Sequence, residues 1–230
     1  MQLPIEWLPA EGTPEQLILL LHGVGADGVS MAPLAQALRA EFPQAALIAP
    51  DAPHPFDAGG PGRQWFSVAG ITEANRAARV AAALPPLVAW VRCTQDRLRV
   101  GPAATAIAGF SQGAILALET ALRNDGLAGR VLAFGGRFAA PPEAAPRHTT
   151  VHLFHGGADP VIPAAHARAA LEALAALQGD ATLDIAEGTG HAIHPALVQR
   201  ALFRLRNHVP ARTWAAALGA VPHPAQDHDD

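Results

Sequence analysis

Short apolar runs alternate with longer helical stretches along most of this 230-residue chain. Strands that are apolar on both faces are buried on both faces, and a parallel sheet covered by helices on its two sides achieves this. We therefore predict an α/β fold: a single domain over residues 1–221 with a mostly parallel, twisted sheet and helices on both faces. The expected strands span 16–21, 46–49, 105–108, 130–134, 151–154 and 182–186, and the expected helices 31–40, 72–92, 112–123, 164–177 and 196–207.

Three further features of the chain shape this prediction. Pro85 and Pro86 fall inside the second expected helix and predict a kink or a split there, because proline lacks the amide donor. Residues 222–230 are polar and acidic and predict a disordered tail. The single cysteine, Cys93, excludes an internal disulfide and a cysteine-cluster metal site, and we expect it half-buried in a helix.

The overall composition excludes several classes of protein. The net charge is −4 and there is no basic run, so the sequence does not indicate a basic surface for binding nucleic acid or an anionic membrane. The apolar run 17–21 is far too short to span a membrane, and the N-terminal residues do not resemble a signal peptide. We therefore expect a cytoplasmic protein with no integral membrane association.

The absence of lysine narrows the chemistry further. All 16 basic residues are arginine, which removes Schiff-base catalysis, a P-loop lysine and Ser–Lys nucleophile pairs. The 11 histidines include no His-x-x-x-His pair on one helix face beside a carboxylate. We accordingly predict no metal and no cofactor.

Ser111 is one of only three serines, and its surroundings are distinctive. Gly109-Phe110-Ser111-Gln112-Gly113 follows an apolar run and opens a helical one. A serine at such a strand–turn–helix junction is held in a strained conformation with its hydroxyl exposed, and the flanking glycines let neighbouring backbone pass close by. The following helix directs its positive end toward this turn. This pattern is typical of the nucleophile elbow of α/β-hydrolases.

Two further residues follow predicted strands at the same edge of the sheet. Asp159 lies in a loop after strand 151–154, and His191 lies between glycines after strand 182–186. Alone, Asp159 is typical of a turn or cap and His191 of an ordinary loop histidine. Together with Ser111 they occur in the hydrolase order Ser, Asp, His, each after a strand, which predicts a catalytic triad.

Other histidines and aspartates compete for these roles. His22 and His155 each precede a glycine at a strand end and fit structural or hole-shaping roles better than that of the base. His194, at an expected helix start, fits a cap or the surface. Asp184 lies within a strand and Asp125 follows a helix, so neither is placed to orient the predicted base.

An oxyanion formed at Ser111 needs backbone donors. We predict the amide of Gln112 as one and the amide of Val24 as the other, because glycines in the loop 22–28 let backbone face the reacting carbonyl. The alternative, that this loop binds phosphate, lacks the spacing of a P-loop or dinucleotide fingerprint.

Over residues 16–207 these segments resemble the phospholipase/carboxylesterase branch of α/β-hydrolases, which includes acyl-protein thioesterases and small bacterial esterases. The matching stretches are Leu20-Leu21-His22-Gly23-Val24-Gly25, Arg63-Gln64-Trp65-Phe66, Gly109-Phe110-Ser111-Gln112-Gly113, His155-Gly156-Gly157-Ala158-Asp159-Pro160-Val161 and Gly190-His191. The pattern is similar to a subgroup often labelled dienelactone-hydrolase-like, although true dienelactone hydrolases use a cysteine nucleophile. The resemblance implies a compact enzyme with little or no lid, in which Trp65 and Phe66 line the acyl pocket. The alternative for Trp65 is a core aromatic packing under its loop.

These observations predict a serine carboxylesterase that hydrolyses small to medium acyl esters through a covalent acyl-Ser111 intermediate. An acyl-protein thioesterase or lysophospholipase acting on longer chains is the alternative, and a non-catalytic binding module on a hydrolase scaffold is a third possibility. The expected partner is a small-molecule ester or thioester, bound by a monomer or homodimer that does not bind nucleic acid.

Overall fold

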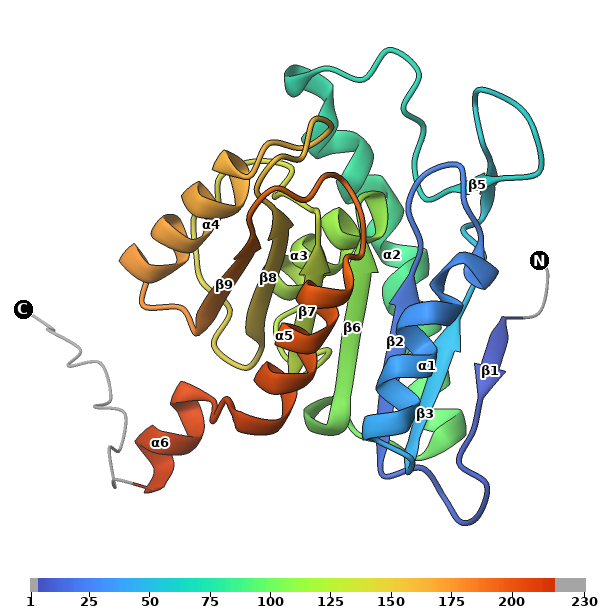
Figure 1. Cartoon of the computed structure of the whole chain (residues 1–230), viewed down its shortest axis with the longest axis vertical. Helices are drawn as coiled ribbons and strands as arrows, with labels where there is room; N and C mark the ends of the chain where they lie inside the picture. Colours follow the sequence, from blue (N-terminus) through green and yellow to red (C-terminus); the bar gives the residue numbers. More distant parts are fainter. Residues whose placement is uncertain (1–3, 218–230) are drawn as a thin grey trace, which may run out of the picture.

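The computed structural model describes residues 4–217 and contains a seven-stranded sheet in the order β1-β3-β2-β6-β7-β8-β9 (Figure 1). All neighbouring strands are parallel except β1 and β3, which are antiparallel. The predicted mostly parallel α/β sheet is therefore confirmed. The strands are β1 (Ile5–Trp7), β2 (Gln16–Leu21), β3 (Ala45–Ala49), β6 (Thr105–Phe110), β7 (Arg130–Phe134), β8 (Thr150–Gly156) and β9 (Ala181–Ala186), and β4 (His54–Pro55) pairs separately with β5 (Arg63–Gln64).

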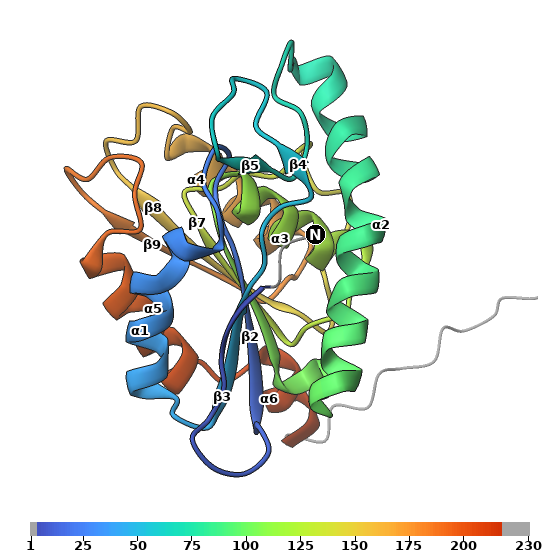
Figure 2. The ribbon, with the colours of Figure 1, turned by 90° about the vertical axis from the view of Figure 1, so that its right-hand side faces the viewer.

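Helices cover both faces of this sheet (Figure 2). On one face lie α1 (Ala32–Glu41), which follows the short 3-10 helix η1 (Gly28–Met31), and α5 (Pro195–Asn207). On the other face lie α2 (Glu73–Leu98), α3 (Gln112–Arg123) and α4 (Ala165–Ala176). A second 3-10 turn, η2 (Pro102–Ala104), precedes β6, and α6 (Ala211–Ala217) follows α5.

The interior strand β2 shows why the chain forms a three-layer structure. Leu17, Leu19 and Leu21 join the core packed against α2 and α3. Ile18 and Leu20 join the core packed against α1 and α5. Because successive strand residues point to opposite faces, a continuously apolar strand needs helices on both sides.

Helix α2 corrects two expectations. It is not split at Pro85 and Pro86, and it continues to Leu98, beyond the predicted range 72–92. Both prolines are exposed, so the missing donors lie on the solvent side of the helix, while Leu84 and Leu87 on either side of them pack into the core. Cys93 lies in this helix but is exposed rather than half-buried.

The ends of the chain differ from the prediction in detail. The edge strand β1 and helix α6 were not predicted; they are only 3 and 7 residues long, too short for a clear hydrophobic period. The tail predicted for 222–230 lies outside the described residues. Within residues 4–217, no helix combines the length and apolar character needed to cross a membrane.

Candidate active site

Ser111 lies at the sharp turn between β6 and α3, with φ 52° and ψ −112°. Positive φ is unfavourable for a residue with a side chain, so surrounding structure must hold this turn in place. A Cβ at Gly113 would lie 2.1 Å from the carbonyl oxygen of Leu21, and a Cβ at Gly109 would lie 2.4 Å from the backbone of Gly113. The two glycines therefore allow α3 to start directly against β2 and β6.

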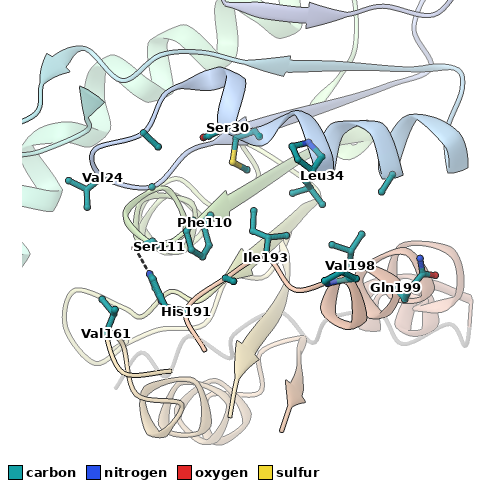
Figure 3. Close-up of a pocket in the computed structure, with 17 residues that line it drawn as sticks. Val24, Ser30, Leu34, Phe110, Ser111, Val161, His191, Ile193, Val198 and Gln199 are labelled. Carbon is teal, nitrogen blue, oxygen red and sulfur yellow. Dashed lines mark hydrogen bonds between the residues drawn. The ribbon is translucent and has the colours of Figure 1, made fainter. Parts of the chain in front are cut away.

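The structure brings Ser111, His191 and Asp159 together from three separate loops at the carboxyl edge of the sheet. His191 Nε2 lies 2.9 Å from Ser111 Oγ (Figure 3). His191 Nδ1 lies 2.7 Å from Asp159 Oδ2. With Nδ1–H donating to the carboxylate, Nε2 is left to accept the serine proton. This geometry is suited to activating the hydroxyl as a nucleophile.

Asp159 is built to remain ionised. Its side chain is buried, which by itself raises the pKa. The hydrogen bond from His191 and those from the amides of Ile162 and Val161 outweigh this effect, and the pKa of the carboxyl is lowered. The two amides bind Oδ1 and leave Oδ2 for the imidazole, so the carboxylate is fixed in both charge and direction.

The competing histidines have other contacts. His22 Nδ1 donates to the carbonyl of Gly23 and its Nε2 accepts from the amide of Ala52, while burial lowers its pKa. His155 is buried and its Nε2 donates to the carbonyl of Ile162 at 2.7 Å, while the same nitrogen lies 3.4 Å from Asp159 Oδ2. His194 accepts from the amide of Ala196 and caps α5, as predicted.

The competing aspartates are also engaged elsewhere. Asp184 is paired with Arg200 and Arg204 of α5. Asp125 accepts from the amides of Arg147 and His148. Neither contacts His191, so Asp159 is the carboxylate that orients this imidazole.

The backbone amides of Val24 and Gln112 have no protein acceptor within residues 4–217, and both residues line a cavity together with Ser111. Gln112 is the first residue of α3, where an amide has no intrahelical partner and the helix dipole is positive. Val24 lies in the loop after β2. A bridge between Ala26 and Arg63 holds this loop, and the side chain of Arg63 donates to the carbonyl of Ala52.

The side chain of Gln112 has a role that the sequence did not indicate. Its Oε1 accepts from the amide of Trp65 and its Nε2 donates to the carbonyl of Phe66, so it ties the segment after β5 to the elbow. Trp65 is buried in the core, and its indole Nε1 donates to the carbonyl of His22. Two cavities open at Ser111, and Trp65 lines neither of them. Its position therefore matches the alternative prediction of a core aromatic under its loop.

The larger cavity at Ser111, of about 690 Å³, runs between α1 and α5 and is termed the apolar cleft. Figure 3 shows Ser111 and His191 at one end, with Leu34 on the α1 side and Ile193 and Val198 on the other. The cleft is further lined by Gly23, Val24, Ala26, Ser30, Met31, Pro33, Ala37, Phe110, Val161, Ala192, Pro195 and Gln199. Its volume suits an organic group of considerable size.

A second cavity, of about 190 Å³, meets Ser111 from the side of α2 and is termed the small pocket. Phe66 lines it, together with the charged or titratable side chains of Arg76, Arg137 and His166. The remaining lining residues are Val24, Val68, Ile71, Gln112, Ile115, Val161 and Ile162. Ser111, Val24 and Val161 line both cavities, so the nucleophile candidate lies where they meet.

The sequence analysis did not identify the charged residues of the small pocket or the apolar residues of the cleft. Arg137 follows β7 at the same sheet edge as the other site residues, and this position was a usable signal. Arg76 in α2 and the residues of α1 and α5 that line the cleft do not follow a strand, so their positions in the sequence gave no such signal. In the part of the chain that the structure describes, no three His, Cys, Asp or Glu side chains are grouped as metal ligands.

The comparisons agree with this architecture. The family model described as Phospholipase/Carboxylesterase matches residues 8–209. The chain belongs to the phospholipase/carboxylesterase family. The esterase YpfH of Escherichia coli is 50% identical over 205 residues, which are 89% of this chain and 88% of that protein.

Two solved structures extend this comparison. A structure of esterase PE8 has a TM-score of 0.83 and 33% identity, covering 90% of this chain and 99% of that one. Acyl-protein thioesterase 2 of Zea mays has a TM-score of 0.66 and 24% identity, covering 88% of this chain and 96% of that one, and at this identity shows the shared fold alone.

Proposed function

We propose that this protein is a serine carboxylesterase that hydrolyses esters of short acyl groups through a covalent acyl-Ser111 intermediate. The observation that carries the proposal is the continuous hydrogen-bonded arrangement Ser111–His191–Asp159 at the meeting point of the two cavities. Membership of the family and the esterase relatives support ester hydrolysis as the reaction.

The chemistry follows from the geometry. His191 Nε2 takes the proton of Ser111 Oγ as the oxygen attacks the substrate carbonyl, and Asp159 stabilises the imidazolium that forms. The amides of Val24 and Gln112 hold the oxyanion, and each such donor is worth on the order of 10²–10³ in rate. His191 then protonates the leaving oxygen and, after the alcohol departs, activates the water that releases the acid.

The orientation of the substrate follows from the proton transfer. The leaving oxygen must lie near His191 Nε2, and His191 lines the apolar cleft but not the small pocket. The alcohol part of the ester therefore extends into the cleft, and the acyl part points toward the small pocket. A volume of about 190 Å³ is below the usual range for ligand pockets, which favours a short acyl chain.

Hydrolysis of long-chain thioesters or lysophospholipids is a second candidate. The cleft of about 690 Å³ is lined mainly by apolar residues and has room for a long chain, if the acyl group lies there instead. The thioesterase-like fold of the Zea mays structure is compatible with this use. The two functions differ in which part of the substrate can be long: the alcohol in the first and the acyl chain in the second.

The test is hydrolysis of p-nitrophenyl esters from acetate to palmitate, together with alkyl acetates of increasing alcohol length. We expect activity to fall with acyl length and to persist with alcohol length; the reverse would favour the second candidate. Ser111→Ala should abolish turnover and labelling by a fluorophosphonate, whereas Ser67→Ala, outside both cavities, should retain both. An active Ser111→Ala protein would refute the mechanism.

We propose a cytoplasmic monomer or homodimer that uses no cofactor and binds no nucleic acid, the last supported by a net charge of −4 without basic runs. Residues 1–221 are proposed to act as one catalytic domain.

A further inference from the structure

The small pocket carries a concentration of positive charge that ester hydrolysis alone does not require. Arg76 and Arg137 line it, and both side chains are largely buried, with 18% and 16% of their surface exposed. Among the described residues, the carboxylate paired with them is that of Glu73, which is mostly exposed and does not itself line the pocket. Burial and the neighbouring Arg137 lower the pKa of His166, so this histidine is neutral at neutral pH. The group has a net charge of about +1.

Arg76 has donors that its partners leave free, whereas Arg137 is largely saturated, since its Nε also donates to the carbonyl of Phe138. Arg137 binds both oxygens of Glu73, at 3.1 and 2.8 Å. Arg76 reaches Glu73 through Nη2 alone, and its buried Nε has no hydrogen-bond partner among residues 4–217. That Nε is shielded from the cavity, but Nη1 of Arg76 also has no protein acceptor among the described residues, and an anion in the pocket would give it charge-assisted hydrogen bonds.

We propose that the small pocket recognises a carboxylate at the far end of a short acyl group, so that the preferred substrates are half-esters of short dicarboxylic acids with apolar alcohols. This inference rests on the proposed function and deepens it. The carboxylate of Glu73 on Arg137 already shows the paired geometry that such an acid would use. A net charge near +1 matches a monoanion better than a phosphate dianion.

The position of the pocket supports the same substrate. Ser111 lines the pocket together with both arginines, so a carboxylate bound there lies within a short chain of the scissile carbonyl. The apolar cleft on the other side of Ser111 receives the alcohol. Phe66, Ile71, Ile115 and Ile162 line the pocket as well and suit the methylene groups between the two carboxyl carbons.

The test compares two esters of nearly identical shape. 2-Naphthyl hydrogen glutarate carries a terminal carboxylate, and 2-naphthyl glutaramate carries a neutral amide in its place. We expect the wild-type protein at pH 7.5 to favour the anionic ester in kcat/KM by roughly tenfold or more, the usual effect of a charged pair in a partly desolvated site. Arg76→Gln and Arg137→Gln should each bring this ratio toward one.

The control is Arg92→Gln, which removes the same charge from an exposed position further along α2 and should keep the wild-type ratio. Arg76 has fewer partners than Arg137, so Arg76→Gln preserves the test if Arg137→Gln does not fold. A wild-type ratio of one or less, or a ratio unchanged in Arg76→Gln, would overturn the inference while p-nitrophenyl ester hydrolysis still supports the esterase. Loss of activity on every ester would instead refute the proposed function itself.

Discussion

Substitution of Gly113 by alanine tests whether close backbone packing sets the geometry at Ser111. The added Cβ would lie 2.1 Å from the carbonyl oxygen of Leu21 and 2.8 Å from that of His22. Real Cβ atoms essentially never come closer than 3.0 Å to such a neighbour, so the start of α3 must move away from β2 by about 0.9 Å. Because the obstacle is backbone in a central strand, no side chain can rotate to relieve it.

This displacement should affect both stability and activity. Forcing extra volume into a packed region costs about 1–3 kcal/mol, which denaturant unfolding will detect. The same shift moves Ser111 and the amide of Gln112 relative to His191, and a misplacement of about 1 Å can cost on the order of 10²-fold in rate. We therefore expect kcat/KM to fall by roughly 10²-fold in protein that is still folded.

Gly101→Ala is the matched control. Its Cβ meets no atom within 4 Å and its φ is −74°, so both stability and kcat/KM should stay near the wild-type values. If Gly113→Ala unfolds at the wild-type midpoint and retains full activity, the argument from backbone contact at the elbow is wrong.

Three further changes test other parts of the molecule. Asp159→Asn should lower kcat by roughly 10³–10⁴-fold with p-nitrophenyl acetate, because the imidazole loses its orienting charge; a loss below tenfold would contradict this role. Burial, aided by Arg130, holds the pKa of His152 at about 3 rather than 6.5. Between these values the unfolded chain binds one more proton, so stability should fall by about 1.4 kcal/mol per pH unit below pH 6.5. Urea unfolding of His152→Gln should show a flatter pH dependence, and an unchanged slope would contradict the assignment. Ala37→Trp narrows the apolar cleft and should slow hydrolysis of naphthyl acetate more than that of methyl acetate, whereas equal slowing would argue against the cleft as the alcohol site.

The parts of the fold that the sequence predicted well are those with strong local signals. The buried strands are continuous apolar runs, and the helix after Ser111 begins and ends at the residues predicted, Gln112 and Arg123. For α2 the sequence predicted a helix with a kink or a split at Pro85 and Pro86. The helix is not split, because an exposed proline interrupts the hydrogen bonds of a long helix without ending it when buried neighbours hold both halves. Local propensity does not report which face of a helix is packed.

Some residues of the candidate site could be predicted from the sequence and others could not. Ser111, Asp159 and His191 could be named because each follows a strand at the carboxyl edge of a parallel sheet, where the topology brings them together. The small pocket could not be named, because it depends on tertiary contacts. Arg137 meets Glu73 across 64 residues of sequence, and only the fold shows that Arg76 lies beside them.

The geometry at the nucleophile and the shapes of the two cavities depend on different parts of the chain. The geometry at Ser111 depends on backbone contacts at Gly109 and Gly113, which allow almost no variation in side chain. The two cavities are lined by residues of all the helices α1 to α5 and of loops, few of which take part in the proton transfers. Changes at Arg76 or Arg137 can therefore alter which acyl group is accepted while the Ser111–His191–Asp159 hydrogen bonds remain intact. Differences in specificity between Arg76→Gln and the wild-type protein should accordingly appear in the relative kcat/KM of anionic and neutral esters, with the rate of fluorophosphonate labelling at Ser111 much less affected.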